Sequence, residues 1–126
     1  MSCSHDFNHL PHNHGNTNID PLFTSLPSIQ DCSKMADTFK LLSDGSRLRI
    51  LSLLCHREEC VQNIAYAVDM SAPAISHHLK FLKQSGLIMS RRVGKEVWYK
   101  LSDTKEALLV HQMIDDIFKI KCSNES

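Results

Sequence analysis

The sequence lacks any long apolar run, since none approaches the ~18 residues needed to span a membrane. Its N-terminus also lacks the charged and then apolar layout of a signal peptide. We therefore expect a cytoplasmic protein. A chain of 126 residues suits one domain with a modest helical core, and it is small enough that dimerisation would help to bury more apolar surface.

No convergent set of acid, base and nucleophile is visible, so an enzyme is the weakest option. A regular cysteine framework is absent as well, and the five cysteines are expected to be thiols rather than disulfides. Cys55 and His56 are neighbours without an orienting third group. We expect a core cysteine and an exposed histidine there, with spare metal ligands near Cys60 as the alternative.

Lysine and arginine are absent from residues 1–27, which are rich in Asn, His, Ser and Pro and show no helical periodicity. We expect a mobile N-terminal arm, followed by a domain at 28–121 and a tail at 122–126. The arm carries five potential metal ligands: Cys3, His5, His9, His12 and His14. The alternative is a solvated low-complexity tail, but the cysteine and the irregular sequence favour the ligand interpretation.

The centre of the chain has the pattern of a helix-turn-helix. Apolar spacing predicts a helix over 61–68, and a second helix begins after Ser71 as N-cap, with Pro73 in its first turn. Only residues 69–71 separate the two, so the connection is a tight turn. One face of the second helix is apolar, and it holds Ile75, Leu79 and Leu82.

Two strands follow, over 87–93 and 96–101, joined by the two-residue turn Gly94-Lys95. A helix-turn-helix followed by a hairpin is a winged helix. The predicted fold class is therefore mainly α with a small β-hairpin, a winged helix-turn-helix that is dimeric.

Local charge supports DNA as the partner, although the formal net charge of the whole chain is zero. Residues 71–100 contain six basic side chains and one acidic side chain, and cations at a hairpin tip suit the phosphates beside a groove. The alternative is a solvated basic face. The side chains expected to contact double-stranded operator DNA are Ser71, Pro73, Ala74, Ser76, His77, Lys80, Arg91, Arg92 and Lys95. His78 is assigned to packing or a buried hydrogen bond.

Two helices precede this unit. The first begins at Ser28, a possible N-cap with Asp31 three residues on, and runs to Leu42 with one apolar face. The second begins at Gly45, is capped by Asp44 and belongs to the core.

A last helix opens at Asp103 or Ser102. Its apolar stripe holds Ala107, Val110, His111, Ile114, Ile117 and Phe118. We expect the first and last helices to form the dimer surface, because an apolar stripe on a terminal helix must be covered by another surface. Two recognition helices one DNA turn apart then read a pseudo-palindrome.

Three motifs follow one another along the chain: LSDGSRLRIL at 42–51, SHHLKFL at 76–82 with SGLI at 85–88, and RRVGK at 91–95 with WY at 98–99. On these motifs the chain resembles the ArsR/SmtB repressors, small dimeric winged-helix proteins that leave DNA when they bind a metal or metalloid. The resemblance covers roughly residues 30–119. One departure is Gly45, where the family commonly has proline.

The resemblance implies a metal site at the start of the 61–68 helix, where family members often have a Cys-Val-Cys run and add ligands from the other subunit's arm. Cys60 matches the first cysteine, and Gln62 stands at the second. A helix N-terminus favours a thiolate. Cys3 with two or more arm histidines would complete a set suited to Zn²⁺, with Cd²⁺, Pb²⁺ and Cu(I) as further candidates. The alternative for Cys60 is a small apolar residue near a helix start.

The family's other metal site lies on the last helix. Asp103 is present, but the remaining matching positions hold Lys105, Asp116 and Lys119. Two lysines repel a divalent cation, so we expect this site to be lost. His111 with Asp115 is a possible replacement, although a lone histidine on such a helix is more often a hydrogen-bonded structural residue.

The leading hypothesis is a metal-sensing repressor: a homodimer holds operator DNA and is released when metal binds between Cys60 and the opposite arm. One alternative is a thiol-redox-sensing repressor of the same fold that uses Cys55, Cys60 or Cys32. Another is a zinc buffer or delivery protein that uses the His-rich arm.

Overall fold

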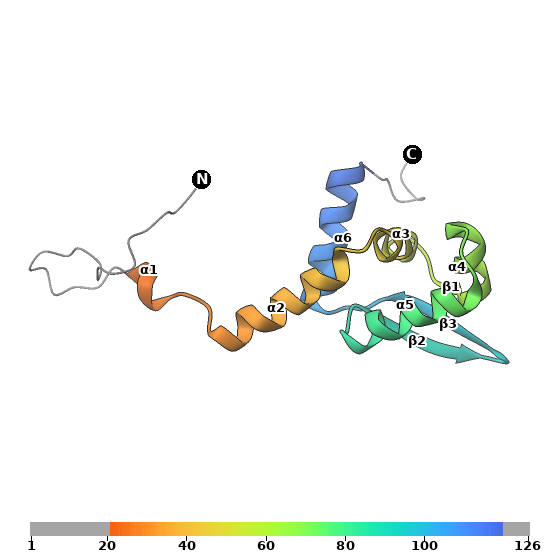
Figure 1. The fold of residues 1–126 in the computed structure, drawn as a ribbon, viewed down its shortest axis with the longest axis horizontal. Helices are drawn as coiled ribbons and strands as arrows, with labels where there is room; N and C mark the ends of the chain where they lie inside the picture. Colours follow the sequence, from red (N-terminus) through yellow and green to blue (C-terminus); the bar gives the residue numbers. More distant parts are fainter. Residues whose placement is uncertain (1–20, 120–126) are drawn as a thin grey trace, which may run out of the picture. The chain divides into compact units, whose positions relative to one another are not determined.

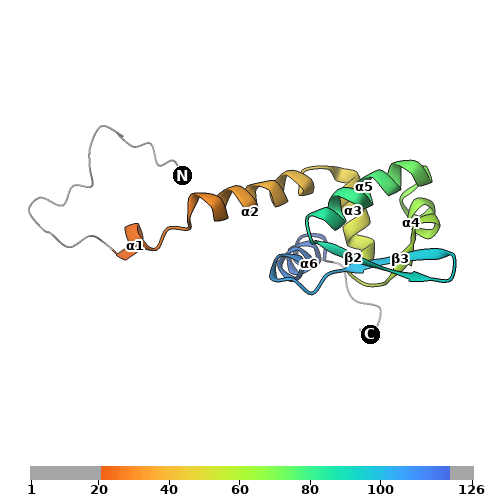
Figure 2. The same ribbon diagram turned by 90° about the horizontal axis from the view of Figure 1, so that it is seen from below.

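The structure is a computed structural model that describes residues 21–119 (Figures 1 and 2). The predictions for the arm ligands and for the tail at 122–126 lie outside this range. The described elements are α1 (Pro21–Thr24), α2 (Ile29–Leu42), α3 (Gly45–Leu54), β1 (Glu59–Cys60), α4 (Val61–Val68), α5 (Ala72–Gln84), β2 (Ile88–Val93), β3 (Glu96–Leu101) and α6 (Lys105–Phe118). The described residues divide into two units, 21–33 and 34–119, and the winged helix lies in the second.

Side-chain caps fix the helix starts, largely as the sequence predicts. Ser28 Oγ accepts the Asp31 N–H at 3.0 Å, and Asp44 Oδ1 accepts the Arg47 N–H at 3.1 Å. Ser71 Oγ likewise accepts a backbone N–H in the first turn of α5, at 3.2 Å.

The predicted start of the last helix is wrong by one or two residues. The cap of α6 is Thr104, whose Oγ1 accepts the Ala107 N–H at 3.1 Å. Ser102 is buried instead, and its backbone N–H donates to the Leu87 carbonyl at 2.9 Å.

The sheet has three antiparallel strands in the order β1-β3-β2, so the predicted two-stranded hairpin was incomplete. β2 and β3 form the expected hairpin, and its turn is permitted by Gly94, which has a φ of +62°. β1 adds Glu59 opposite Tyr99 and Cys60 opposite Trp98. A two-residue strand has no alternation that a sequence pattern can reveal.

The core lies between α3, α4, α5, α6 and the inner end of the hairpin. Its fully buried side chains are Ile50, Leu51, Ile64, Ile75, Leu79, Leu82, Leu87 and Ile114. On α6, Ala107, Val110 and Ile114 are buried in this core. The expectation that the whole stripe of the last helix faces a partner is therefore wrong, because half of it packs within the protomer.

Large apolar side chains remain exposed on α2 and on the other side of α6. Phe39 is 57% exposed, and Leu109 is 56% exposed. Both line an apolar groove together with Met35, Thr38, Leu42, Glu106, Val110 and Met113. Among residues 21–119, no helix has the length and apolar character needed to cross a membrane.

Candidate nucleic-acid interface and sensor sites

α4, a tight turn and α5 form the helix-turn-helix. Asp69 caps the C-terminus of α4 in the left-handed conformation (φ 59°, ψ 51°), and the Met70 N–H donates to the Ala65 carbonyl at 3.0 Å. The buried face of α5 leaves its opposite face in solvent. Of the residues predicted to contact DNA here, Ser71, Pro73, Ser76, His77 and Lys80 are exposed, and Ala74 is half-buried.

The two neighbouring histidines of α5 have different surroundings. His77 is exposed, and its ring meets Phe81 edge-on at 4.8 Å between centroids. His78 is half-buried, and its Nδ1 accepts a hydrogen bond from Arg47 Nε at 3.1 Å. The Arg47 guanidinium also lies 5.5 Å from the centre of the Phe81 ring. These contacts agree with a structural role for His78, which ties α5 to α3.

The wing exposes Arg91, Arg92 and Lys95, but the two arginines differ. Arg91 is engaged by Glu58: its Nε and Nη2 donate to the two carboxylate oxygens, both at 2.8 Å. This hydrogen bonding lowers the pKa of the Glu58 carboxyl and raises the pKa of the Arg91 guanidinium. Glu58 thus neutralises a predicted phosphate contact, a feature that sequence reasoning missed.

Strand register places the two arginines on opposite faces of the sheet. Arg91 lies opposite Trp98, and Arg92 lies opposite Val97. By alternation Arg92 shares its face with Ile88, which is buried in the core beneath α5. Arg92 is therefore on the helical side of the wing, and no ion pair to it is found among the described residues.

Cys60 is the N-cap residue of α4 and is only 5% exposed. Its side chain makes no capping hydrogen bond. It lines a pocket with Val61, Gln62, Ser76, Lys95, Glu96, Val97 and Tyr99. Ser76 and Lys95 belong to the predicted DNA-contacting set, so Cys60 lies beside both α5 and the wing.

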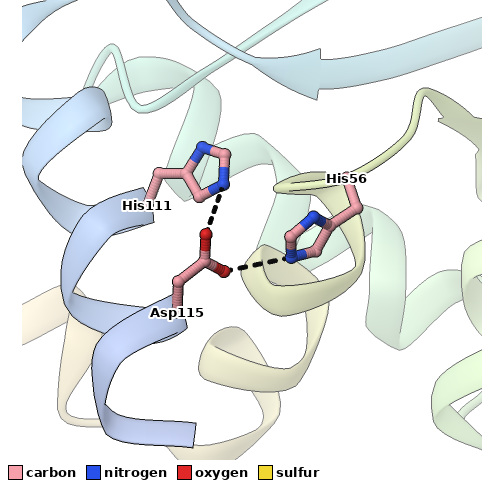
Figure 3. Close-up of side chains that lie close together, drawn as sticks. All are labelled: His56, His111 and Asp115. Carbon is pink, nitrogen blue, oxygen red and sulfur yellow. Dashed lines mark hydrogen bonds and ion pairs between the residues drawn. The ribbon is translucent and has the colours of Figure 1, made fainter. Parts of the chain in front are cut away.

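A cluster of three potential metal ligands lies between the loop after α3 and the helix α6 (Figure 3). His56 Nε2 is 3.0 Å from Asp115 Oδ1, and His111 Nε2 is 3.0 Å from Asp115 Oδ2. The two imidazole rings are 5.3 Å apart and nearly perpendicular. The His56 side chain is only 13% exposed, so the expectation of an exposed histidine is wrong. The predicted hydrogen-bonded role of His111 agrees with these contacts.

Sequence spacing relates only two members of this cluster. His111 and Asp115 are four residues apart on one helix face, which the sequence shows. His56 is 59 residues from Asp115 and reaches it only through the tertiary fold.

Comparison with known proteins agrees with this geometry. The profile described as "Bacterial regulatory protein, arsR family" matches residues 44–90. A "Transcriptional repressor SmtB homolog" of Synechocystis is 38% identical over 90 residues, which are 71% of this chain and 68% of that protein. The "Cadmium resistance transcriptional regulatory protein CadC" of Listeria innocua is 41% identical over 76 residues, which are 60% of this chain and 64% of that protein.

A solved structure is also similar. It is the homodimeric winged helix-turn-helix DNA-binding domain Mb0332 of Mycobacterium bovis, described as a possible ArsR-family regulator. The match has a TM-score of 0.63 and 28% identity, and it covers 75% of this chain and 90% of that chain.

The helix-turn-helix, its exposed polar face and the basic wing define a winged helix-turn-helix transcription regulator. More particularly, the chain belongs to the ArsR/SmtB family of bacterial regulators. The resemblance of its motifs to this family is thereby confirmed. The prediction that the protein is not an enzyme is confirmed too, because the family consists of transcription regulators.

Proposed function

We propose that this protein is a cytoplasmic metal-sensing repressor, which holds operator DNA as a homodimer and releases it on binding Zn²⁺, with Cd²⁺ or Pb²⁺ as further effectors. The observation that carries the proposal is the position of Cys60. This thiol lies at the start of α4, in a pocket that it shares with Ser76 of α5 and Lys95 of the wing.

The DNA-binding part of the proposal rests on exposure and charge. α5 enters the major groove with Ser76, His77 and Lys80 on its exposed face. Arg92 and Lys95 contact phosphates beside that groove, which fixes the orientation of the helix on the duplex.

The homodimer is supported by the exposed apolar side chains of α2 and α6. Phe39 and Leu109 are more than half exposed and line a common groove, an arrangement typical of an interaction surface. The similar Mycobacterium bovis domain is homodimeric. A second copy of this chain is therefore the expected occupant of the groove.

The donor set at Cys60 is completed by the N-terminal arm in this proposal. The other polar side chains that line the pocket are Gln62, Ser76, Lys95, Glu96 and Tyr99, so the described residues offer a single thiol there. Cys3 with arm histidines, His5, His9, His12 or His14, would supply the mixed nitrogen and sulfur ligands that suit tetrahedral Zn²⁺. The similarity to a cadmium resistance regulator supports a thiophilic effector.

The route from Cys60 to the DNA-binding surface is short. Cys60 pairs with Trp98 of β3, and it follows Glu58, the partner of Arg91, by two residues. A metal that binds and displaces Cys60 therefore shifts the wing and the start of α4 together. Coupling of ~1–3 kcal/mol is the usual range between such sites.

The test is fluorescence anisotropy of the reduced protein on DNA from upstream of its own gene, at fixed salt, with chelator and then with Zn²⁺ or Cd²⁺. Wild-type protein should bind with chelator and leave with metal. Cys60→Ser and a deletion of residues 1–15 should bind DNA and ignore the metal. If all three proteins hold DNA regardless of metal, the proposed sensing mechanism is wrong, although the repressor remains.

The same assay separates the alternative functions. A redox sensor would leave DNA when peroxide is added to a chelator-treated sample; Cys32 is exposed, whereas burial of Cys60 disfavours its direct oxidation. A zinc buffer would take up metal through the arm with no change in DNA affinity.

A further inference from the structure

We infer that His56, His111 and Asp115 form a second metal site within each protomer, suited to a divalent first-row cation such as Zn²⁺. It differs from the Cys60 site in position and in ligand chemistry, since it uses nitrogen and oxygen donors alone. It also differs from the last-helix site that the family resemblance implies, where Lys105 and Lys119 replace ligands. The inference stands independently of the proposed function.

The carboxylate of Asp115 lies between the imidazole rings of His56 and His111, as Figure 3 shows. The ligand atoms of the three side chains all lie within 4.8 Å of one another. One carboxylate oxygen is 3.0 Å from His56 Nε2, and the other is 3.0 Å from His111 Nε2. Bonds of ~2.0–2.1 Å from zinc to nitrogen and oxygen place tetrahedral ligands about 3.4 Å apart. Small side-chain rotations therefore suffice to bring all three atoms onto one ion.

The donor chemistry fits this cation. Two imidazoles and a carboxylate form a common catalytic and regulatory donor set for Zn²⁺, and the fourth position is left for water. A carboxylate only accepts hydrogen bonds, so each imidazole now donates its Nε2–H to Asp115. When a metal binds, an imidazole protonated on both nitrogens releases its Nε2 proton, whereas a neutral imidazole holds its single proton on Nδ1; in both cases Nε2 becomes the ligand atom.

The setting is that of a partly enclosed site rather than of a surface ion pair. The side chains of His56, His111 and Asp115 are 13%, 28% and 22% exposed. An ion held there therefore has limited contact with solvent and still has an open path for entry.

Such an ion would cross-link two parts of the protomer. His56 lies in the loop that leads through Glu58 to β1, and the other two ligands lie on α6, which carries the proposed dimer surface. A metal bound here ties that loop to α6, and because it binds the folded protomer it stabilises the folded state.

The test is a Zn²⁺ titration of the reduced full-length protein against a competing chromophoric chelator, in four forms: wild type, Asp115→Asn, Cys60→Ser and the double variant. Asp115→Asn should weaken the binding of one zinc ion per protomer by on the order of 100-fold or more. Cys60→Ser should leave that ion in place, and the double variant should lose both the Cys60 ion and this one. Co²⁺ bound to Cys60→Ser should show d–d bands without a thiolate charge-transfer band.

Asp116→Asn is the matched control, because it makes the same change one residue along, at an exposed carboxylate outside the cluster. It should bind zinc as wild type does. His111→Asn repeats the test with a second ligand, and circular dichroism of the metal-free variants checks their fold. If Asp115→Asn and His111→Asn retain wild-type zinc stoichiometry and affinity, the cluster is only a hydrogen-bonded triad and the inference is overturned. If wild-type protein instead stays on DNA when metal is added, while its zinc titration still depends on Asp115, the Cys60 mechanism is refuted and this inference stands.

Discussion

Glu58→Gln should strengthen DNA binding and make it more sensitive to salt. The carboxylate of Glu58 holds Arg91 through two hydrogen bonds of 2.8 Å. The Arg91 side chain is 61% exposed, so it is free to swing towards a phosphate once its partner has lost its charge. The substitution also removes a negative charge from beside the wing.

The magnitude follows from counterion release. Each phosphate neutralised by a cation adds about 0.9 to the steepness of the fall of log K with log salt concentration. A dimer has two wings, so the release of both Arg91 side chains adds up to about 1.8. Between roughly 50 and 200 mM salt, the variant should lose about 12-fold more affinity than the wild type does.

The assay is anisotropy on one DNA duplex at four or more salt concentrations, without metal. Arg92→Gln is the opposing variant, because this exposed cation has no ion pair among the described residues and its loss should make the slope shallower. Arg91→Gln should change the slope less than Arg92→Gln does. An unchanged slope in Glu58→Gln, alongside a shallower one in Arg92→Gln, would refute the view that Glu58 restrains a phosphate-binding arginine.

Three further variants test the fold and the dimer. Asp44→Ala should cost about 1 kcal/mol in urea denaturation at neutral pH. The hydrogen bond from the Arg47 N–H lowers the pKa of Asp44 below its ordinary value of 3.8. The stabilisation by the ionised cap is therefore complete above pH 3.8 and is lost as the pH falls through the lower pKa of the folded state. The difference in stability between Asp44→Ala and wild type should shrink in acid. Leu79→Ala, at a site 1% exposed, should lower the free energy of unfolding by about 3 kcal/mol. Leu109→Glu, at a site 56% exposed, should leave the protomer folded and give monomers in sedimentation; persistent dimers would exclude this surface as the interface.

The sequence was most informative where structure depends on near neighbours. The caps at Asp44 and Ser71 lie within three residues of the N–H groups that they accept, and the apolar positions of α5 repeat at helical spacing. The turn at Gly94 is equally local. These features can be predicted because each depends only on a few adjacent residues.

Features that depend on distant parts of the chain were missed or misassigned. β1 exists because Cys60 and its neighbour pair with β3, and two residues carry no pattern of their own. Arg91 is bound by Glu58 from 33 positions away. The burial of Val110 follows from the packing of α6 on the core, since periodicity identifies an apolar face but not its partner.

The central claim, that metal and DNA oppose each other on one protein, is tested most directly by measuring zinc affinity with and without saturating operator DNA. Thermodynamic linkage requires the two effects to be equal. If zinc weakens DNA binding by a given factor, DNA must weaken zinc binding at the Cys60 site by the same factor, on the order of 5- to 150-fold. Equal zinc affinities for the free and DNA-bound protein would contradict the account.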